Sequence, residues 1–102
     1  MENVTFKFKL GLMQNMTIKS PLEIIIDDNE KFNVDPSGSL SVTVADGSHK
    51  MRLSICVVES YGDQGRLGIL DTKLDVRPGV KYLVTYKYAS MFMKGSVSIK
   101  TV

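Results

Sequence analysis

The chain contains 102 residues, of which 43% are hydrophobic and 24% charged, and it carries a net charge of +2 at pH 7. Its length predicts one domain, residues 1–102, which can bury enough surface to fold without cross-links, and its composition excludes wholesale disorder. The small net charge does not indicate a nucleic-acid partner, and no apolar run approaches the roughly 20 residues that cross a bilayer.

The first ten residues, MENVTFKFKL, alternate between apolar and polar side chains. This pattern predicts a strand over 4–10 whose lysines face water, and it lacks the continuous apolar segment of a secretory signal peptide. The single cysteine, Cys56, cannot form an intrachain disulfide, which fits a reducing compartment. We therefore expect a cytoplasmic protein with no transmembrane segment, or an exported one if the chain is an excised module.

A period of two continues along the rest of the chain, and short turn sequences interrupt it about every 8–12 residues. No stretch combines a helical period with helix caps. Strands are predicted over 4–10, 16–27, 32–34, 39–45, 49–59, 67–76, 80–89 and 95–101. Pro21 should lie at an edge or an interruption of its strand. These elements indicate an all-β fold, either an antiparallel β-sandwich of about seven or eight strands or a small barrel, and we favour the sandwich.

Two segments, 41–55 and 73–87, repeat one pattern at a spacing of 32 residues. Each contains a strand, a turn with glycine and a second strand, so both are predicted to form β-arches of the same construction. His49 in the first segment aligns with Lys81 in the second. Because a lysine occupies the equivalent position, we expect His49 to be a polar residue facing solvent. Its parity with Met51 alternatively places the ring over the rim of the core.

Residues 22–55, LEIIIDDNEKFNVDPSGSLSVTVADGSHKMRLSI, resemble the PEGA-type bacterial surface modules. The matching features are an apolar strand, an Asp turn, another strand and a second turn in which His49 follows Gly47. Asp46 stands where these modules usually have a proline. The resemblance implies a β-sandwich with a binding or spacing role.

Residues 74–86, LDVRPGVKYLVTY, resemble the corner of Ig-like and fibronectin-like sandwiches. In that corner a tyrosine hydroxyl hydrogen-bonds to the upstream backbone, and the resemblance gives this role to Tyr82. Together, the two resemblances imply an Ig-like or prealbumin-like sandwich that binds or spaces rather than catalyses, and they imply no particular ligand.

Catalytic arrangements find little support in the sequence. His49 and Cys56 are seven residues apart on one predicted strand. That spacing separates them by roughly 23 Å and places them on opposite faces, too far apart for a nucleophile–base pair. One histidine and one cysteine are too few for a zinc site, and neither a Gly-x-Ser-x-Gly elbow nor a phosphate-binding glycine loop is present. We therefore expect no enzymatic activity, no catalytic residue and no cofactor.

Acidic residues near the predicted turns offer the hard oxygen ligands that calcium prefers. They are Asp27, Asp28, Glu30 and Asp46. Turns favour the same residue types because their side chains hydrogen-bond locally, and no regular calcium-loop spacing is present. Turn formation is therefore the preferred interpretation of these residues, and a calcium site is the alternative.

If consecutive strands alternate in direction, the turns sort to the two ends of the domain. One end then receives the apolar and glycine-containing loops, and the other receives short polar and acidic turns. Flexible methionines suit adaptable binding surfaces. The predicted binding residues at the first end are Met13, Tyr61, Arg66, Met91, Phe92 and Met93. The alternative is that the apolar loop side chains fold back and close this end of the sandwich.

We therefore expect a non-enzymatic binding or interaction module whose preferred partner is a protein. A carbohydrate partner is less favoured because the chain has no tryptophan, and its candidate residues are Tyr61, Asp63, Gln64 and Arg66. A nucleic-acid partner is not expected, because the tyrosines of 80–89 share a face with valines while the lysines point the other way. The remaining alternative is a structural domain that forms a homo-oligomer through an exposed strand edge.

Overall fold

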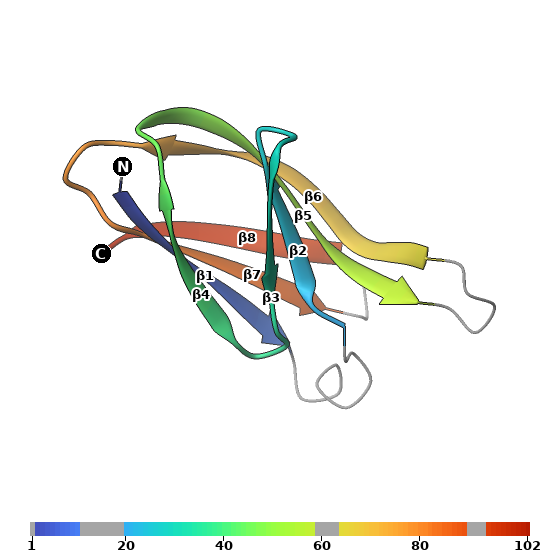
Figure 1. Cartoon of the computed structure of the whole chain (residues 1–102). Coiled ribbons are helices and arrows are strands. Elements are labelled where there is room, and N and C mark those ends of the chain that lie inside the picture. Colours follow the sequence, from blue (N-terminus) through green and yellow to red (C-terminus); the bar gives the residue numbers. More distant parts are fainter. Residues whose placement is uncertain (1, 11–19, 59–63, 90–93) are drawn as a thin grey trace.

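The computed structural model describes residues 2–10, 20–58, 64–89 and 94–102, and these ranges contain strands, turns and links but no helix (Figure 1). The strands are β1 (Glu2–Leu10), β2 (Leu22–Ile26), β3 (Glu30–Val34), β4 (Ser39–Val44), β5 (Gly47–Val58), β6 (Gln64–Val76), β7 (Tyr82–Ala89) and β8 (Lys94–Thr101). The expected all-β class is confirmed. Strand β2 begins directly after Pro21, because proline lacks the N–H that a strand ladder uses. In the described ranges there is no helix long and apolar enough to span a membrane.

The eight strands form two four-stranded sheets that lie face to face (Figure 1). Sheet I has the order β4-β1-β7-β8, and sheet II has the order β3-β2-β5-β6. All neighbouring strands are antiparallel except β1 and β7, which are parallel. The expectation of purely antiparallel pairing is therefore wrong for this pair. Successive strands reverse direction along the chain, so β1 and β7 run the same way once packing makes them neighbours.

The core lies between the two sheets and follows the alternation of the strands. In β1, Phe6 and Phe8 are each 1% exposed, whereas the intervening Lys7 is exposed on the other side of the sheet. The face of β7 that the tyrosines and valines were predicted to share points into the core, because its three tyrosines and Val84 are all buried. The buried apolar residues are Val4, Phe6, Phe8, Leu22, Ile24, Ile26, Val34, Val44, Met51, Leu53, Ile55, Leu74, Val76, Tyr82, Val84, Tyr86 and Tyr88.

Tyr86 connects the sheets at a point where two glycines leave room for its ring. The pairing of β5 with β6 shifts so that β6 holds one extra residue, and Gly68 in this bulge has a φ of 59°. The buried hydroxyl of Tyr86 donates a hydrogen bond to the carbonyl of Gly68 at 2.5 Å. Burial, with a further contribution from Tyr88, raises the pKa of Tyr86 to about 12. A Cβ at Gly68 or Gly95 would overlap the Tyr86 side chain, so both positions require glycine.

The two repeated segments do form β-arches, since β4–β5 and β6–β7 each pass from one sheet to the other. In the second arch, Pro78 and Gly79 (φ 79°) form a turn closed by the Val80 N–H and the Arg77 carbonyl at 3.2 Å. The Tyr82 hydroxyl accepts a hydrogen bond from the Arg77 N–H at 3.0 Å, as expected for that tyrosine. This bond fixes the arch as it enters β7.

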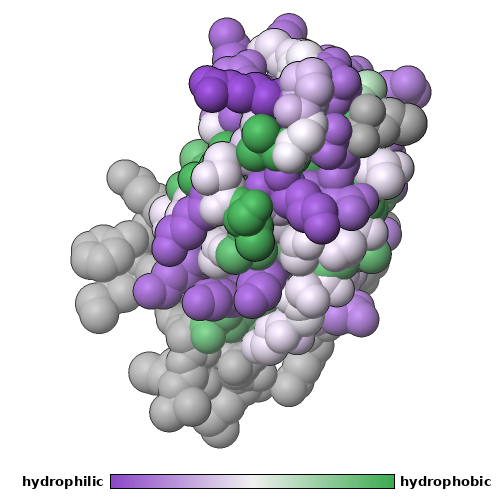
Figure 2. Space-filling model, turned by 90° about the vertical axis from the view of Figure 1, so that its left-hand side faces the viewer, coloured by the Kyte–Doolittle hydropathy of each residue, from purple (hydrophilic) through white to green (hydrophobic). Residues whose placement is uncertain are grey.

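The links between strands sort to two ends, as the alternating direction predicts. The arches β4–β5 and β6–β7 lie at one end, which we call the arch end, and the turn at 35–38 lies at the other (Figure 1). Viewed from the arch end, hydrophilic side chains predominate and hydrophobic ones form only small separate groups (Figure 2). Strands β1, β5 and β7 instead run toward the opposite end of the domain, where each of them ends (Figure 1). We call this the loop end.

Candidate binding surface

Most of the predicted binding residues, namely Met13, Tyr61, Met91, Phe92 and Met93, lie outside the described residues. Arg66 is described, and its guanidinium is engaged within the chain. It donates to Glu23 Oε1 at 3.0 Å and to Ser54 Oγ at 3.1 Å. Ser54 is 1% exposed, so Arg66 supplies the partner that a buried hydroxyl needs. Within the described part of the chain, the role of Arg66 is to join β6 to β5 and β2 across the outer side of sheet II.

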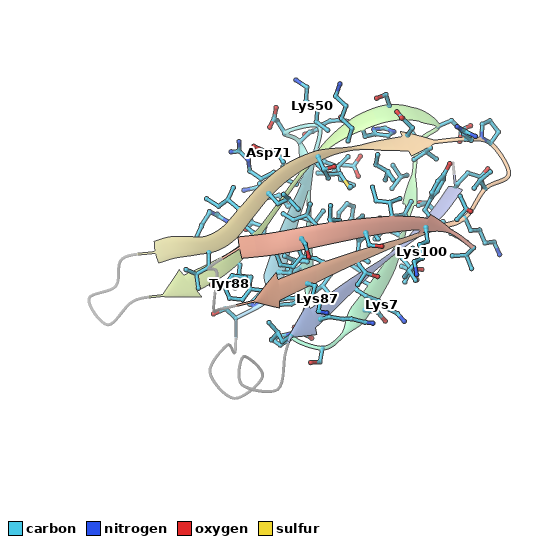
Figure 3. All side chains as sticks on the ribbon, turned by 180° about the vertical axis from the view of Figure 1, so that it is seen from behind. Lys7, Lys50, Asp71, Lys87, Tyr88 and Lys100 are labelled. Atoms are coloured by element: carbon cyan, nitrogen blue, oxygen red, sulfur yellow. The ribbon has the colours of Figure 1, made fainter. Side chains whose placement is uncertain are left out.

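The outer side of sheet I, which faces away from sheet II, carries lysines and hydroxyl residues but no carboxylate among the described side chains. We call this surface the lysine face. Its described side chains are Asn3, Thr5, Lys7, Lys9, Ser39, Ser41, Thr43, Leu83, Thr85, Lys87, Ser96, Ser98 and Lys100. Figure 3 shows Lys7, Lys87 and Lys100 on the side of sheet I opposite to Lys50 and Asp71 of sheet II. Among the described side chains, the outer surface of sheet I is therefore positively charged, whereas that of sheet II carries both lysines and carboxylates.

Three lysines of this face gather around one hollow of ≈360 Å³. Lys9 and Lys87 are direct neighbours in the parallel pairing of β1 with β7, and Lys7 lies two residues earlier on β1. The hollow is completed by Ser37 and Gly38 of the turn before β4, by Ser39 at the start of β4, and by Phe8 and Leu10. It therefore lies at the loop end, beside the last residue of β1.

The lysines of the hollow lack ionic partners within the described part of the chain. The ion pairs found there are His49–Asp27, Arg52–Asp71 and Arg66–Glu23. Lysines at neighbouring cross-strand positions, such as Lys9 and Lys87, repel each other. An anionic group placed in the hollow would relieve this repulsion and accept hydrogen bonds from the ammonium groups. The arrangement can bind an anion, and it contains no acid–base pair for catalysis.

The lysine hollow was not anticipated from the sequence. The outward lysines of β1 were expected, but Lys87 joins them only because β7 pairs with β1, about 80 residues later in the chain. The parity of Lys87, opposite to that of the buried tyrosines, was the one available signal. This parity indicates on which face of β7 the lysine lies, but it does not indicate which strand lies beside β7.

At the arch end, His49 is held between two acceptors. Its Nδ1 lies 2.6 Å from Asp27 Oδ2, and its Nε2 lies 2.6 Å from the carbonyl oxygen of Ala45. Asp27 also accepts the Lys50 N–H through Oδ1 at 3.0 Å. Because neither an ionised carboxylate nor a carbonyl can donate, the ring makes both hydrogen bonds only when both of its nitrogens carry hydrogens, which is the imidazolium form.

The hydrogen bond to Asp27 is the largest influence that raises the pKa of His49, and it also lowers the pKa of Asp27. Burial opposes the rise for His49, and the Ala45 carbonyl supports it. The histidine side chain is only 12% exposed. The expectation that His49 faces solvent and is interchangeable with lysine is therefore wrong. Its two ring nitrogens hydrogen-bond to the β2–β3 turn and to the β4–β5 arch, and so connect them.

Two of the four candidate calcium residues, Asp27 and Asp28, form the turn between β2 and β3. Asp27 and Asp28 have φ values of 52° and 57°, which are typical of a type I′ turn, and the Asn29 N–H donates to the Ile26 carbonyl at 3.1 Å. Both carboxylate oxygens of Asp27 are used by His49 and Lys50. Across the described residues, no group of three or more His, Cys, Asp or Glu side chains could hold a metal ion.

Calcium is accordingly expected to leave the thermal midpoint of unfolding unchanged at millimolar concentration. Asp27, the best-placed ligand, would have to release His49 before it could bind the ion. Differential scanning fluorimetry with calcium, and with magnesium as the control, measures this directly. A rise in midpoint specific to calcium would restore the metal interpretation of Asp28 and Glu30.

Comparison of the chain with protein-family models, with curated proteins and with solved structures found no match.

Proposed function

We propose that this chain is a non-enzymatic binding module that contacts an acidic region of a protein partner. The contact surface is the lysine hollow together with the adjoining loop end. The observation that carries this proposal is the gathering of Lys7, Lys9 and Lys87 around a hollow whose lining contains no carboxylate. The methionine and phenylalanine residues predicted to bind at the loop end would supply the apolar anchors that ammonium groups cannot provide.

A protein partner is favoured over nucleic acid by the composition of the lysine face. Its described side chains include no arginine, whose planar fork suits phosphate, and no aromatic ring on which a base could stack. The tyrosines of β7 are at most 6% exposed because they point into the core. Lysines are point charges without directional demands, which suits the varied positions of carboxylates on a protein surface.

A carbohydrate partner has less support. Of its candidate residues, Tyr61 and Asp63 lie outside the described residues, and the guanidinium of Arg66 is already bonded to Glu23 and Ser54. Recruitment of Arg66 by a sugar would leave the buried Ser54 hydroxyl without that donor, which is unfavourable.

We further infer that the two sheets form a sandwich of the Ig-like or prealbumin-like type. The hydrogen bond between the Tyr82 hydroxyl and the Arg77 N–H supports this inference, because it occupies the position of the corner tyrosine in Ig-like sandwiches. The resemblance of residues 22–55 to PEGA-type surface modules is consistent with a binding or spacing role.

Replacing Lys7, Lys9 and Lys87 together with glutamate is expected to weaken binding to an acidic ligand by roughly tenfold or more, because like charges then face each other. A poly-glutamate peptide serves as the probe, and NMR chemical shifts report its position. In the wild type, the largest shifts should occur at the three lysines and at Ser37–Ser39. The effect should diminish as salt is added.

The control replaces Lys31, Lys50 and Lys73 of sheet II with glutamate, which changes the net charge equally. This control should keep its affinity for the peptide, and both triple variants should keep the wild-type thermal midpoint within a few degrees. Equal loss of binding in both variants would show that only net charge matters, and it would refute the lysine hollow as the site.

A further inference from the structure

The two sheets have four edge strands, and β4 differs from the other three. Natural proteins protect exposed edges with charges, prolines or bulges. Strand β3 contains Glu30 and Lys31, β8 begins with a lysine and contains Lys100, and β6 contains the Gly68 bulge and several charged residues. Strand β4, SLSVTV, has no charge, no proline and no glycine. Its composition therefore lacks the usual protection against pairing with another chain.

The register of β4 shows which of its backbone groups point outward. The Phe8 N–H donates to the Gly38 carbonyl at 3.1 Å, in the same antiparallel register that pairs β1 with β4. Hydrogen-bonded pairs alternate along such a ladder, so Leu40 and Val42 direct their N–H and C=O groups to β1. The intervening residues direct theirs away from β1. These outward residues are Ser39, Ser41 and Thr43.

Beside the outer edge of β4, the described residues leave a groove. Among the described strands, only β1 pairs with β4. A groove of ≈600 Å³ lies between β4 and β3, and it is lined in part by Val42, Thr43 and Phe32. Phe32 and Val42 are only partly buried against the core. There is consequently room for a further strand and for its inward side chains.

We propose that β4 pairs antiparallel with β4 of a second copy of this chain, so that the two copies of sheet I join across a twofold axis. Residues opposite each other in an antiparallel pair point to the same face. If Ser41 lies on the axis, Ser39 faces the partner's Thr43 on the outer side and Leu40 faces the partner's Val42 on the inner side. Hydroxyls then meet hydroxyls, and apolar side chains meet apolar side chains.

This self-matching favours a second copy over a strand of unrelated sequence. The same register brings the outward N–H and C=O groups of Ser39, Ser41 and Thr43 opposite their counterparts in the second copy. Within the joined sheet, repulsion between lysines is weak, because the nearest lysine-bearing strands of sheet I, β1 and the partner's β1, are separated by three strand spacings. That distance is about 14 Å, longer than the Debye length of about 8 Å at physiological ionic strength.

The dimer should be weak, because one six-residue edge buries less surface than the roughly 1,200–2,000 Å² of a stable interface. The lysine faces of the two copies would lie on the same side of the joined sheet. An acidic partner with two binding regions could then engage both copies. This consequence rests on the proposed function, whereas the pairing of β4 does not.

Replacing Thr43 with proline tests the proposal, because it removes an outward N–H and leaves the hydrogen bonds between β4 and β1 in place. Sedimentation velocity from micromolar to millimolar protein should show the wild type shifting from monomer toward dimer. The T43P variant should remain a monomer, and the T43V control, which retains the N–H, should dimerise like the wild type. A wild type that stays monomeric, or a T43P variant that dimerises, would overturn the proposal.

Amide hydrogen exchange of the wild type provides a test that does not depend on a variant folding. Protection should increase with protein concentration at Ser39, Ser41 and Thr43, whereas Leu40 and Val42 should be protected at every concentration. Concentration-dependent protection in β6 or β8 instead of β4 would place the contact on another edge and refute the proposal. Both readouts are independent of poly-glutamate, so failure of the lysine hollow and failure of the dimer can be distinguished.

Discussion

Replacing Gly68 with alanine is expected to destabilise the fold by about 2–5 kcal/mol, combining a left-handed backbone with overpacking. The backbone at Gly68 has a φ of 59°, which disfavours any side chain. The added Cβ would also overlap the hydroxyl of Tyr86 and approach the ring of Tyr88. Tyr86 is fully buried and cannot move aside freely. Urea denaturation of the wild type and the variant measures the loss.

Gly79 supplies a matched control, since it also has a positive φ, 79°, but a Cβ there would meet nothing within 4 Å. Replacing Gly79 with alanine should therefore lose only about 1–2 kcal/mol, the backbone contribution. Adding Tyr86→Phe to Gly68→Ala should recover part of the loss, because it removes the atom that the new methyl group meets first. Equal losses at Gly68 and Gly79 would contradict the close packing of Tyr86 against β6.

The second large effect is a dependence of stability on pH through His49. Its pKa in the folded state is raised above the ordinary value of 6.5, so the folded state favours the protonated ring. The stabilisation is therefore fully present below pH 6.5 and is lost as pH rises through the raised pKa. Thermal unfolding should show a midpoint that falls over this interval. His49 is the only histidine in the chain.

Replacing His49 with glutamine should remove this fall and lower the midpoint at pH 6. Asp27 gives the opposite pH dependence of stability. Its pKa is lowered below 3.8, so its contribution to stability is lost as pH falls through that lowered value. The variant Asp27→Asn should lose both the acidic and the neutral pH dependence of the midpoint. Combining it with His49→Gln should cause little further loss of stability, since the two residues form one contact. If the thermal midpoints of the wild type and His49→Gln changed with pH in parallel, the hydrogen bonds of the protonated His49 ring would not stabilise the fold.

Local patterns in the sequence were sufficient to predict most of the strands, both β-arches and the face that the tyrosines of β7 share. The strand predicted over 16–27 was too long, because residues 20, 21 and 27 lie outside β2. Alternation with a period of two depends only on the geometry of an extended chain, and turns depend on nearby residues such as Pro78 and Gly79. The bond between the Tyr82 hydroxyl and the Arg77 backbone spans five residues, and the resemblance of residues 74–86 to the corner of Ig-like sandwiches implied it. Each of these features is determined within a short stretch of chain.

The tertiary structure alone decided which strands became neighbours, and the candidate surfaces depend on that choice. The parallel pairing of β1 with β7 places Lys87 beside Lys9, and the approach of the β2–β3 turn to β5 places Asp27 against His49. The order of the sheets likewise leaves β4 at an edge. A period of two shows which side of a sheet a residue faces. Strand neighbours are chosen by the packing of the whole core, which joins residues far apart in the chain.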